Sequence, residues 1–217
     1  TLKNGMRSLI SKNLKNSNIM IRNITLLNLT ALASFAFSSL NGPVEVLTVN
    51  TEKSVIKWEG YKVTGKHNGT VALKDGNLQF EDGQLTGGSF AMDMTSITVL
   101  DLTGNYKAKL EGHLKSDDFF GVEKYPTAKF EITRVVSRGM PGDYKIEGDL
   151  TVKGITKPIR FNATVTEENG VQVAKADMKL DRTDYNVRYG SGSFFDNLGD
   201  KTIYDEFDLS VELVANK

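Results

Sequence analysis

The feature that most constrains the fold is a strict alternation of apolar and polar residues after position 43. It is clearest at 207–213, where the sequence FDLSVEL places an apolar residue at every second position. The same pattern recurs at 56–61, 90–95, 129–133, 144–153 and 161–166. Because successive side chains of a strand point to opposite faces, each segment predicts a strand with one buried face and one solvated face.

Short segments rich in Gly, Asn, Asp and Pro separate these predicted strands, at 74–77, 81–83, 140–143 and 167–170. Such turns join hairpins, so the sheet is expected to be mainly antiparallel. A long antiparallel sheet with one apolar face must close on itself or pack against a second sheet. We count about eight strands, and the sequence therefore predicts an all-β protein. A closed barrel of that size leaves room inside for side chains or for one ligand.

One segment departs from the period of two. Between Thr103 and Asp118, the residues Tyr106, Leu110 and Leu114 recur at every fourth position. This spacing predicts one short amphipathic helix, with Thr103 as its N-cap. A single helix in an otherwise β protein is expected to lie across the barrel or to cover one of its mouths.

The distribution of charge separates residues 1–40 from the rest of the chain. Residues 1–40 contain Lys and Arg but neither Asp nor Glu, so all 27 acidic residues follow them. The part after residue 40 is consequently net negative. This balance argues against binding to nucleic acid and against adhesion to anionic membrane surfaces.

The segment 20–42 has the order of a secretory signal peptide. Met20 and Arg22 are followed by a mostly apolar stretch and then by small residues at 36–39. The apolar stretch is too short and too polar for a typical membrane span, which leaves an uncleaved anchor as the alternative. We predict a signal peptide cleaved within 36–42, a folded domain at 44–217 and a periplasmic or secreted location. Residues 1–19 are expected to be an unstructured extension or an artefact of the gene start, with Met20 as the natural start, or else a long basic region of the signal.

The chain has no cysteine and two histidines, which limits its chemistry. His67 lies in a glycine-rich turn and His113 in the predicted helix, and no H-x-x-x-H spacing is present. We therefore predict neither a metal site nor a resident cofactor. The alternative that includes catalysis is a hydrolase or isomerase that uses His113 with an acidic partner.

Several motifs, in the same order along the chain, resemble those of the YceI-like family. The stretch 112–126, GHLKSDDFFGVEKYP, is similar to the family signature HLKS-x-DFF-x-x-x-x-YP, and 148–158, GDLTVKGITKP, is similar to its GDLTIKGVTKPV hairpin. The stretch 181–187, DRTDYNV, resembles a further family motif, and the resemblance covers about 44–216. It departs at the first hairpin, where Asn50 and Lys53 replace a frequent Asp and His, so no role of that histidine is carried over.

The resemblance implies an extended, lipocalin-like barrel whose interior holds a polyisoprenoid chain, such as an isoprenoid quinone or a polyprenyl phosphate. The expected function is an exported, non-enzymatic carrier of an apolar isoprenoid lipid that makes transient contact with membranes. A stress-related structural module with a filled barrel is the third alternative. Monomer and homodimer both stay open.

The side chains on the apolar faces are the candidate ligand contacts, and we expect them to line a tunnel without charged residues. A filled core would show the same pattern, but the pair Met92 and Met94 favours an irregular apolar pocket. Phe119 and Phe120 would plug or gate the mouth beside the helix. Arg182 and Tyr185 would donate to a polar head group, or Arg182 would pair with an acidic residue, Asp184 or Asp205. The predicted ligand-binding residues are Trp58, Phe80, Phe90, Met92, Met94, His113, Phe119, Phe120, Phe130, Ile146, Phe161, Arg182, Tyr185 and Phe207.

Overall fold

The computed structural model describes residues 42–216. The extension predicted at 1–19 and, apart from Gly42, the signal peptide predicted at 20–42 lie outside the described residues. The strands are β1 (Glu45–Val49), β2 (Val55–Lys62), β3 (Gly65–Glu81), β4 (Gln84–Val99), β5 (Thr127–Ser137), β6 (Asp143–Val152), β7 (Ile155–Glu168), β8 (Val171–Asp181) and β9 (Ile203–Asn216). The helices are α2 (Gly104–Lys115) and the short 3-10 turns η1 (Arg182–Tyr185) and η2 (Gly199–Lys201).

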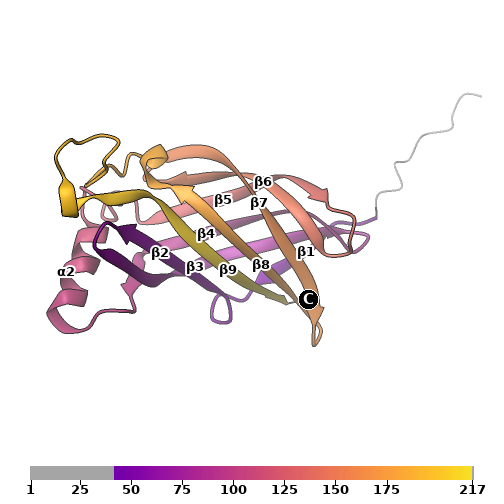
Figure 1. Cartoon of the computed structure of the whole chain (residues 1–217). Helices are drawn as coiled ribbons and strands as arrows, with labels where there is room; N and C mark the ends of the chain where they lie inside the picture. The colour runs from indigo at the N-terminus through magenta and orange to yellow at the C-terminus, as the bar shows by residue number, and fades with distance from the viewer. Residues whose placement is uncertain (1–41, 217) are drawn as a thin grey trace, which may run out of the picture. The chain divides into compact units, whose positions relative to one another are not determined.

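The nine strands form one antiparallel sheet that closes into a barrel with eight places around the ring (Figure 1). Each strand from β3 to β8 pairs with the next one along the chain, and β2 closes the ring against β9. β1 and β2 share one place, because both pair with β3 and with β9 at successive levels. The predicted all-β antiparallel barrel is therefore confirmed.

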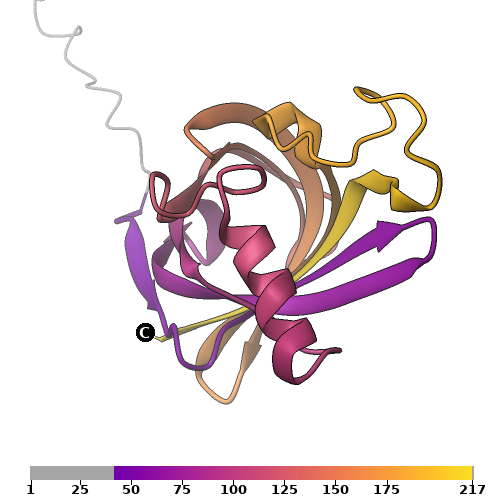
Figure 2. The same cartoon turned by 90° about the vertical axis from the view of Figure 1, so that its left-hand side faces the viewer.

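The antiparallel path divides the loops between two ends of the barrel. The helix end carries the β2–β3 turn, α2, the β6–β7 turn and the segment 182–202, whereas the opposite end carries the turns after β3, β5 and β7. Figure 2 shows the helix end, with α2 lying across the ring of strands. The prediction that a single α-helix covers one mouth agrees with this arrangement.

Helix α2 is shorter than predicted and does not turn its whole apolar stripe toward the barrel. Leu114 is buried and Leu110 is half-buried, but Tyr106 is 76% exposed. The stripe prediction is wrong at Tyr106, which lies in the first turn of the helix and faces solvent. Thr103 occupies the N-cap position without donating or accepting a side-chain cap hydrogen bond.

The apolar faces of the strands meet inside the barrel and form a continuous core. Its larger part, which includes Leu78, Phe130 and Ile146, runs toward the opposite end. A second cluster around Val99, Leu114 and Phe119 lies under α2.

Candidate functional site

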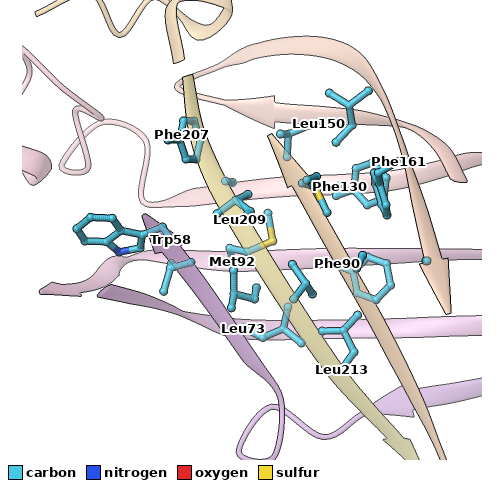
Figure 3. A pocket seen from close by; sticks show the side chains of 18 of the residues that line it. Trp58, Leu73, Phe90, Met92, Phe130, Leu150, Phe161, Phe207, Leu209 and Leu213 are labelled. Carbon is cyan, nitrogen blue, oxygen red and sulfur yellow. The ribbon is translucent and has the colours of Figure 1, made fainter. Parts of the chain in front are cut away.

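The interior of the barrel contains a cavity of about 240 Å³. Its wall is built from the inward faces of strands β2 to β9 and from the corner that follows α2. Figure 3 shows the side chains converging on it, among them Trp58, Leu73, Phe90, Met92, Phe130, Leu150, Phe161, Phe207, Leu209 and Leu213. The alternation read along each strand thus supplies one shared apolar wall.

An aromatic row crosses the middle of the wall. Phe90 of β4 lies opposite Phe130 of β5 in the strand register, and their ring centroids are 6.3 Å apart. Phe161 of β7 continues the row, with its ring centroid 5.5 Å from that of Phe130. β4 and β5 are neighbours in the sheet, whereas β6 lies between β5 and β7, so the row follows the curve of the wall around the cavity.

Of the fourteen predicted ligand-binding residues, eleven lie in the cavity wall: Trp58, Phe90, Met92, Met94, Phe119, Phe120, Phe130, Ile146, Phe161, Arg182 and Phe207. The other three, Phe80, His113 and Tyr185, lie outside it. Phe80 and Tyr185 are buried in the core, and burial raises the pKa of Tyr185 to about 12.

The wall also includes residues that we did not predict. Ala174, Ala176 and Met178 of β8 line the cavity. In the sequence they alternate with the charged residues Lys175, Asp177 and Lys179. Alanine is only weakly apolar, however, so this alternation is less distinct than on the other strands. On β3 the unpredicted lining residues are Val71, Leu73 and Leu78, and register shifts on both sides of Leu73 break the period of two.

The expectation of a wall without charged residues is wrong at Arg182. Its side chain is 3% exposed and lies between the cavity and the start of β9. The guanidinium donates to the backbone oxygens of Tyr204 at 3.0 Å, Val187 at 2.7 Å and Ile203 at 3.0 Å, and to Asp205 Oδ1 at 3.3 Å. Burial lowers the pKa of Arg182, and the charge of Asp205 opposes that shift. Of the two predicted acidic partners, Asp205 is the one that pairs with Arg182.

Lys175 also borders the cavity, but only through its stem. Its side chain is 52% exposed, and its ammonium group pairs with Glu212 on the outer surface at 3.4 Å. Lys175 therefore leaves the interior apolar. Arg182, satisfied by backbone oxygens, is the charged side chain that borders the cavity near the helix end.

The corner after α2 closes the wall at the helix end. Phe119 is buried, and its ring lies 5.1 Å from that of Phe120 between centroids. Backbone hydrogen bonds from Phe120 N to Leu114 O and from Gly121 N to Ser116 O hold the corner against the helix. Lys153 Nζ donates to Phe119 O at 2.6 Å and fixes the corner to the β6–β7 turn.

Two buried ring nitrogens near this end have no hydrogen-bond partner among the described residues: Trp58 Nε1, in the cavity wall, and His113 Nε2. The ring of His113 packs edge-on against Phe119 and Tyr189, with centroids 5.4 and 4.4 Å away. Its neighbours are thus aromatic, whereas the catalytic alternative required an acidic residue beside it.

Within residues 42–216, no cluster of three or more His, Asp and Glu side chains has the geometry of a metal site. None of the helices in this part of the chain has the length and apolar character needed to cross a membrane.

Comparison with known proteins matches the chain to one family. The YceI-like domain matches residues 47–215. A UPF0312 protein of Pseudomonas putida is 32% identical over 156 residues, which cover 69% of this chain and 74% of that protein. A UPF0312 protein of Photorhabdus laumondii is 34% identical over 128 residues, covering 56% of this chain and 62% of that protein.

Two solved structures share the fold. BcnA of Burkholderia cenocepacia superposes with a TM-score of 0.64 at 20% identity, covering 77% of this chain and 99% of BcnA. A domain of Saccharophagus degradans described as polyisoprenoid-binding and implicated in plant cell wall breakdown superposes with a TM-score of 0.57 at 12% identity, covering 78% and 97%. With the domain match over most of its length, the chain belongs to the YceI-like family.

Proposed function

We propose that this protein is an exported carrier that encloses the chain of an isoprenoid lipid in its barrel. The observation that carries the proposal is the apolar wall, which is continuous from β2 round to β9. An apolar chain enters such a space because its surface is removed from water, and each buried CH₂ contributes roughly 0.8 kcal/mol. The polyisoprenoid-binding description of the Saccharophagus degradans domain supports the same ligand class.

The wall of the cavity includes side chains that can adapt to a long ligand. The cavity of about 240 Å³ is lined almost entirely by apolar side chains. Met92, Met94 and Met178 lie in the wall, and their unbranched, flexible side chains can adopt new rotamers at low cost.

The polar head of the lipid belongs, in this proposal, at the helix end. Trp58 lines the cavity there, and its buried Nε1, which has no hydrogen-bond partner among the described residues, would donate to a carbonyl or phosphate oxygen that came within reach. Arg182 is already satisfied by four acceptors, so its principal role is to hold the wall.

Organic extraction of the protein purified from its native host, followed by mass spectrometry, tests the proposal. We expect a stoichiometric isoprenoid lipid in the wild type and its loss in Phe161→Asp, because a charge inside a dry cavity is costly. Asn162→Asp is the matched control, since the neighbouring Asn162 is exposed. It should retain the lipid. A folded wild type that yields no lipid contradicts the proposal and favours a structural module.

The proposed export rests on the order of basic, apolar and small residues at 20–42. N-terminal sequencing of the mature protein checks it directly. A first residue within 37–43 is expected from cleavage at 36–42. A mature protein that retains 20–35 contradicts cleavage.

A further inference from the structure

Exposed aromatic side chains gather at one end of the barrel. Within residues 42–216, the exposed aromatic residues all lie at the helix end: Tyr106, Tyr125, Tyr189, Phe194, Phe195 and Tyr204. The large apolar side chains exposed at the opposite end are aliphatic, for example Met140 at 67%. Large exposed aromatic groups gathered around one opening mark an interaction surface rather than random surface composition.

Four of these residues form what we call the aromatic rim: Tyr189, Phe194, Phe195 and Tyr204. The first three lie on the segment that joins η1 to β9, which Figure 2 shows at the same end of the barrel as α2, and Tyr204 is the second residue of β9. The exposed fractions of these residues are 49%, 45%, 51% and 51%.

The segment is held in place by buried contacts. Ser191 is fully buried, its backbone oxygen accepts from the amides of Phe194 and Phe195, and its amide donates to Arg188 O. The Arg188 guanidinium lies 4.3 Å from the centroid of the Phe194 ring. The two phenylalanines are therefore presented outward by an ordered turn.

The aromatic rim is continuous with the cavity. Tyr204 and its neighbour Ile203 line the cavity, and Arg182 binds both of their backbone oxygens. Tyr189 contacts His113 of α2, which covers the same mouth. A surface that touches the rim thus lies against the end of the barrel where Ile203, Tyr204 and the corner after α2 form the wall of the cavity.

The charges on this segment are mixed. The charges of Arg188 and Lys201 are balanced by those of Asp196 and Asp200. The segment therefore has no net positive charge that would attract an anionic polymer or surface. Tyrosine favours the interface between lipid head groups and acyl chains, where its ring is apolar and its hydroxyl stays hydrated, and phenylalanine is found on the apolar face of segments that bind there.

We propose that the aromatic rim docks the helix end on the surface of a lipid bilayer, with Phe194 and Phe195 inserted among the head groups. Docking would place the mouth of the cavity against the membrane. Docking of this kind rests on the proposed carrier function, but binding to a bilayer needs no ligand in the cavity. An experiment can therefore reject the docking without rejecting the carrier, and the reverse.

Sedimentation of the purified protein with vesicles of pure phosphatidylcholine is the test. We expect wild type to bind and F194S/F195S to bind about tenfold more weakly or worse, because two inserted rings are lost. Met140→Ser is the control at the opposite end and should bind as wild type does. Raising the salt from about 0.1 to about 0.5 M should leave binding unchanged, since screening affects only charge attraction.

Three results would overturn the docking: no binding of wild type, equal binding of F194S/F195S, or self-association of wild type that depends on these two phenylalanines, which would assign the rim to a second copy. Lipid extraction is run in parallel on the same preparations. Lipid without vesicle binding rejects docking alone, and vesicle binding without lipid rejects the carrier alone.

Discussion

Arg182 shows how one residue can tie the end of one strand to the start of another. It follows β8 directly, and its guanidinium binds the backbone of 203–204 and of Val187. These carbonyls are buried or part-buried, so the guanidinium donates to acceptors with limited access to water. Arginine suits the position because its planar group presents five N–H donors in a fixed geometry.

Replacing Arg182 with Met should therefore lower the free energy of unfolding strongly. It removes the guanidinium that donates to three backbone oxygens and to Asp205, and loss of one partner of a buried charged network costs about 3–5 kcal/mol. Urea unfolding followed by circular dichroism measures the change in the free energy of unfolding. Arg134→Met is the control, because Arg134 is 66% exposed in its ion pair with Glu147 and should cost less than about 1 kcal/mol. Equal costs for both variants would contradict the anchoring role.

Gly69 should tolerate no side chain. A Cβ at this position would lie 1.8 Å from Thr98 O and 2.5 Å from Trp58 Cζ2, so Gly69→Ala forces the backbone of β4 or the indole to move. Overpacking of this kind costs about 1–3 kcal/mol. The fluorescence of Trp58, the single tryptophan, should shift as well. Gly112→Ala is the control, because a Cβ at Gly112 of α2 meets open space, and it should stabilise the protein by up to about 1 kcal/mol. Unchanged Trp58 fluorescence in Gly69→Ala would contradict the predicted clash.

At the scale of elements, α2 is attached to the barrel by one carboxylate. Glu111 accepts from Thr98 Oγ1 at 2.6 Å and from the Val99 amide at 2.9 Å, at the end of β4. These hydrogen bonds lower the pKa of Glu111, the Thr98 hydroxyl contributing most. The covering helix is thus held at its middle as well as by its packing through Leu114.

This attachment predicts a pH dependence. Because the pKa of Glu111 is lower in the folded state, its contribution to stability is present above its ordinary value of 4.5 and is lost as the pH falls through the folded value. Wild type should exceed Glu111→Gln in free energy of unfolding at pH 7, and the difference should shrink toward zero in strong acid. Glu123→Gln, at an exposed site, should show no such difference. A gap that persists at low pH would contradict the mechanism.

Most strands could be predicted from the sequence because the alternation of apolar and polar residues follows which side chains are buried. The alternation is clear on β6 and β9, whose apolar residues are large. It was weak on β8, where alanines face the cavity, and on β3, where bulges shift the register. The position of Tyr106 could not be read from helical spacing, since the first turn of α2 has nothing to pack against.

At the scale of the whole molecule, the cavity leaves the folded state with apolar surface that has no partner. A ligand that fills it binds only the folded state, so it must raise the stability of the protein. Sequence could predict an apolar interior but not its hollowness, because a packed core and a cavity wall have the same alternation. The volume depends on how side chains from eight strand places meet.

A delipidated preparation should therefore melt at a lower temperature than one given back its lipid. A ligand at one hundred times its dissociation constant stabilises the folded state by about 2.7 kcal/mol. Calorimetry with added isoprenoid measures the shift. Phe161→Asp should show none while remaining folded, and a shift of equal size in that variant would place the lipid outside the barrel.

The pairing of β2 with β9 also has a consequence for the order of synthesis. The two strands that close the ring lie near opposite ends of the described chain, with Val55 facing Glu212. A ribosome-bound chain can form the hairpins from β3 to β8, yet the gap between β8 and β2 stays open until the last strand, 14 residues long, has emerged. Until that moment the apolar lining faces water, so the nascent barrel is at its most prone to aggregation just before it is finished.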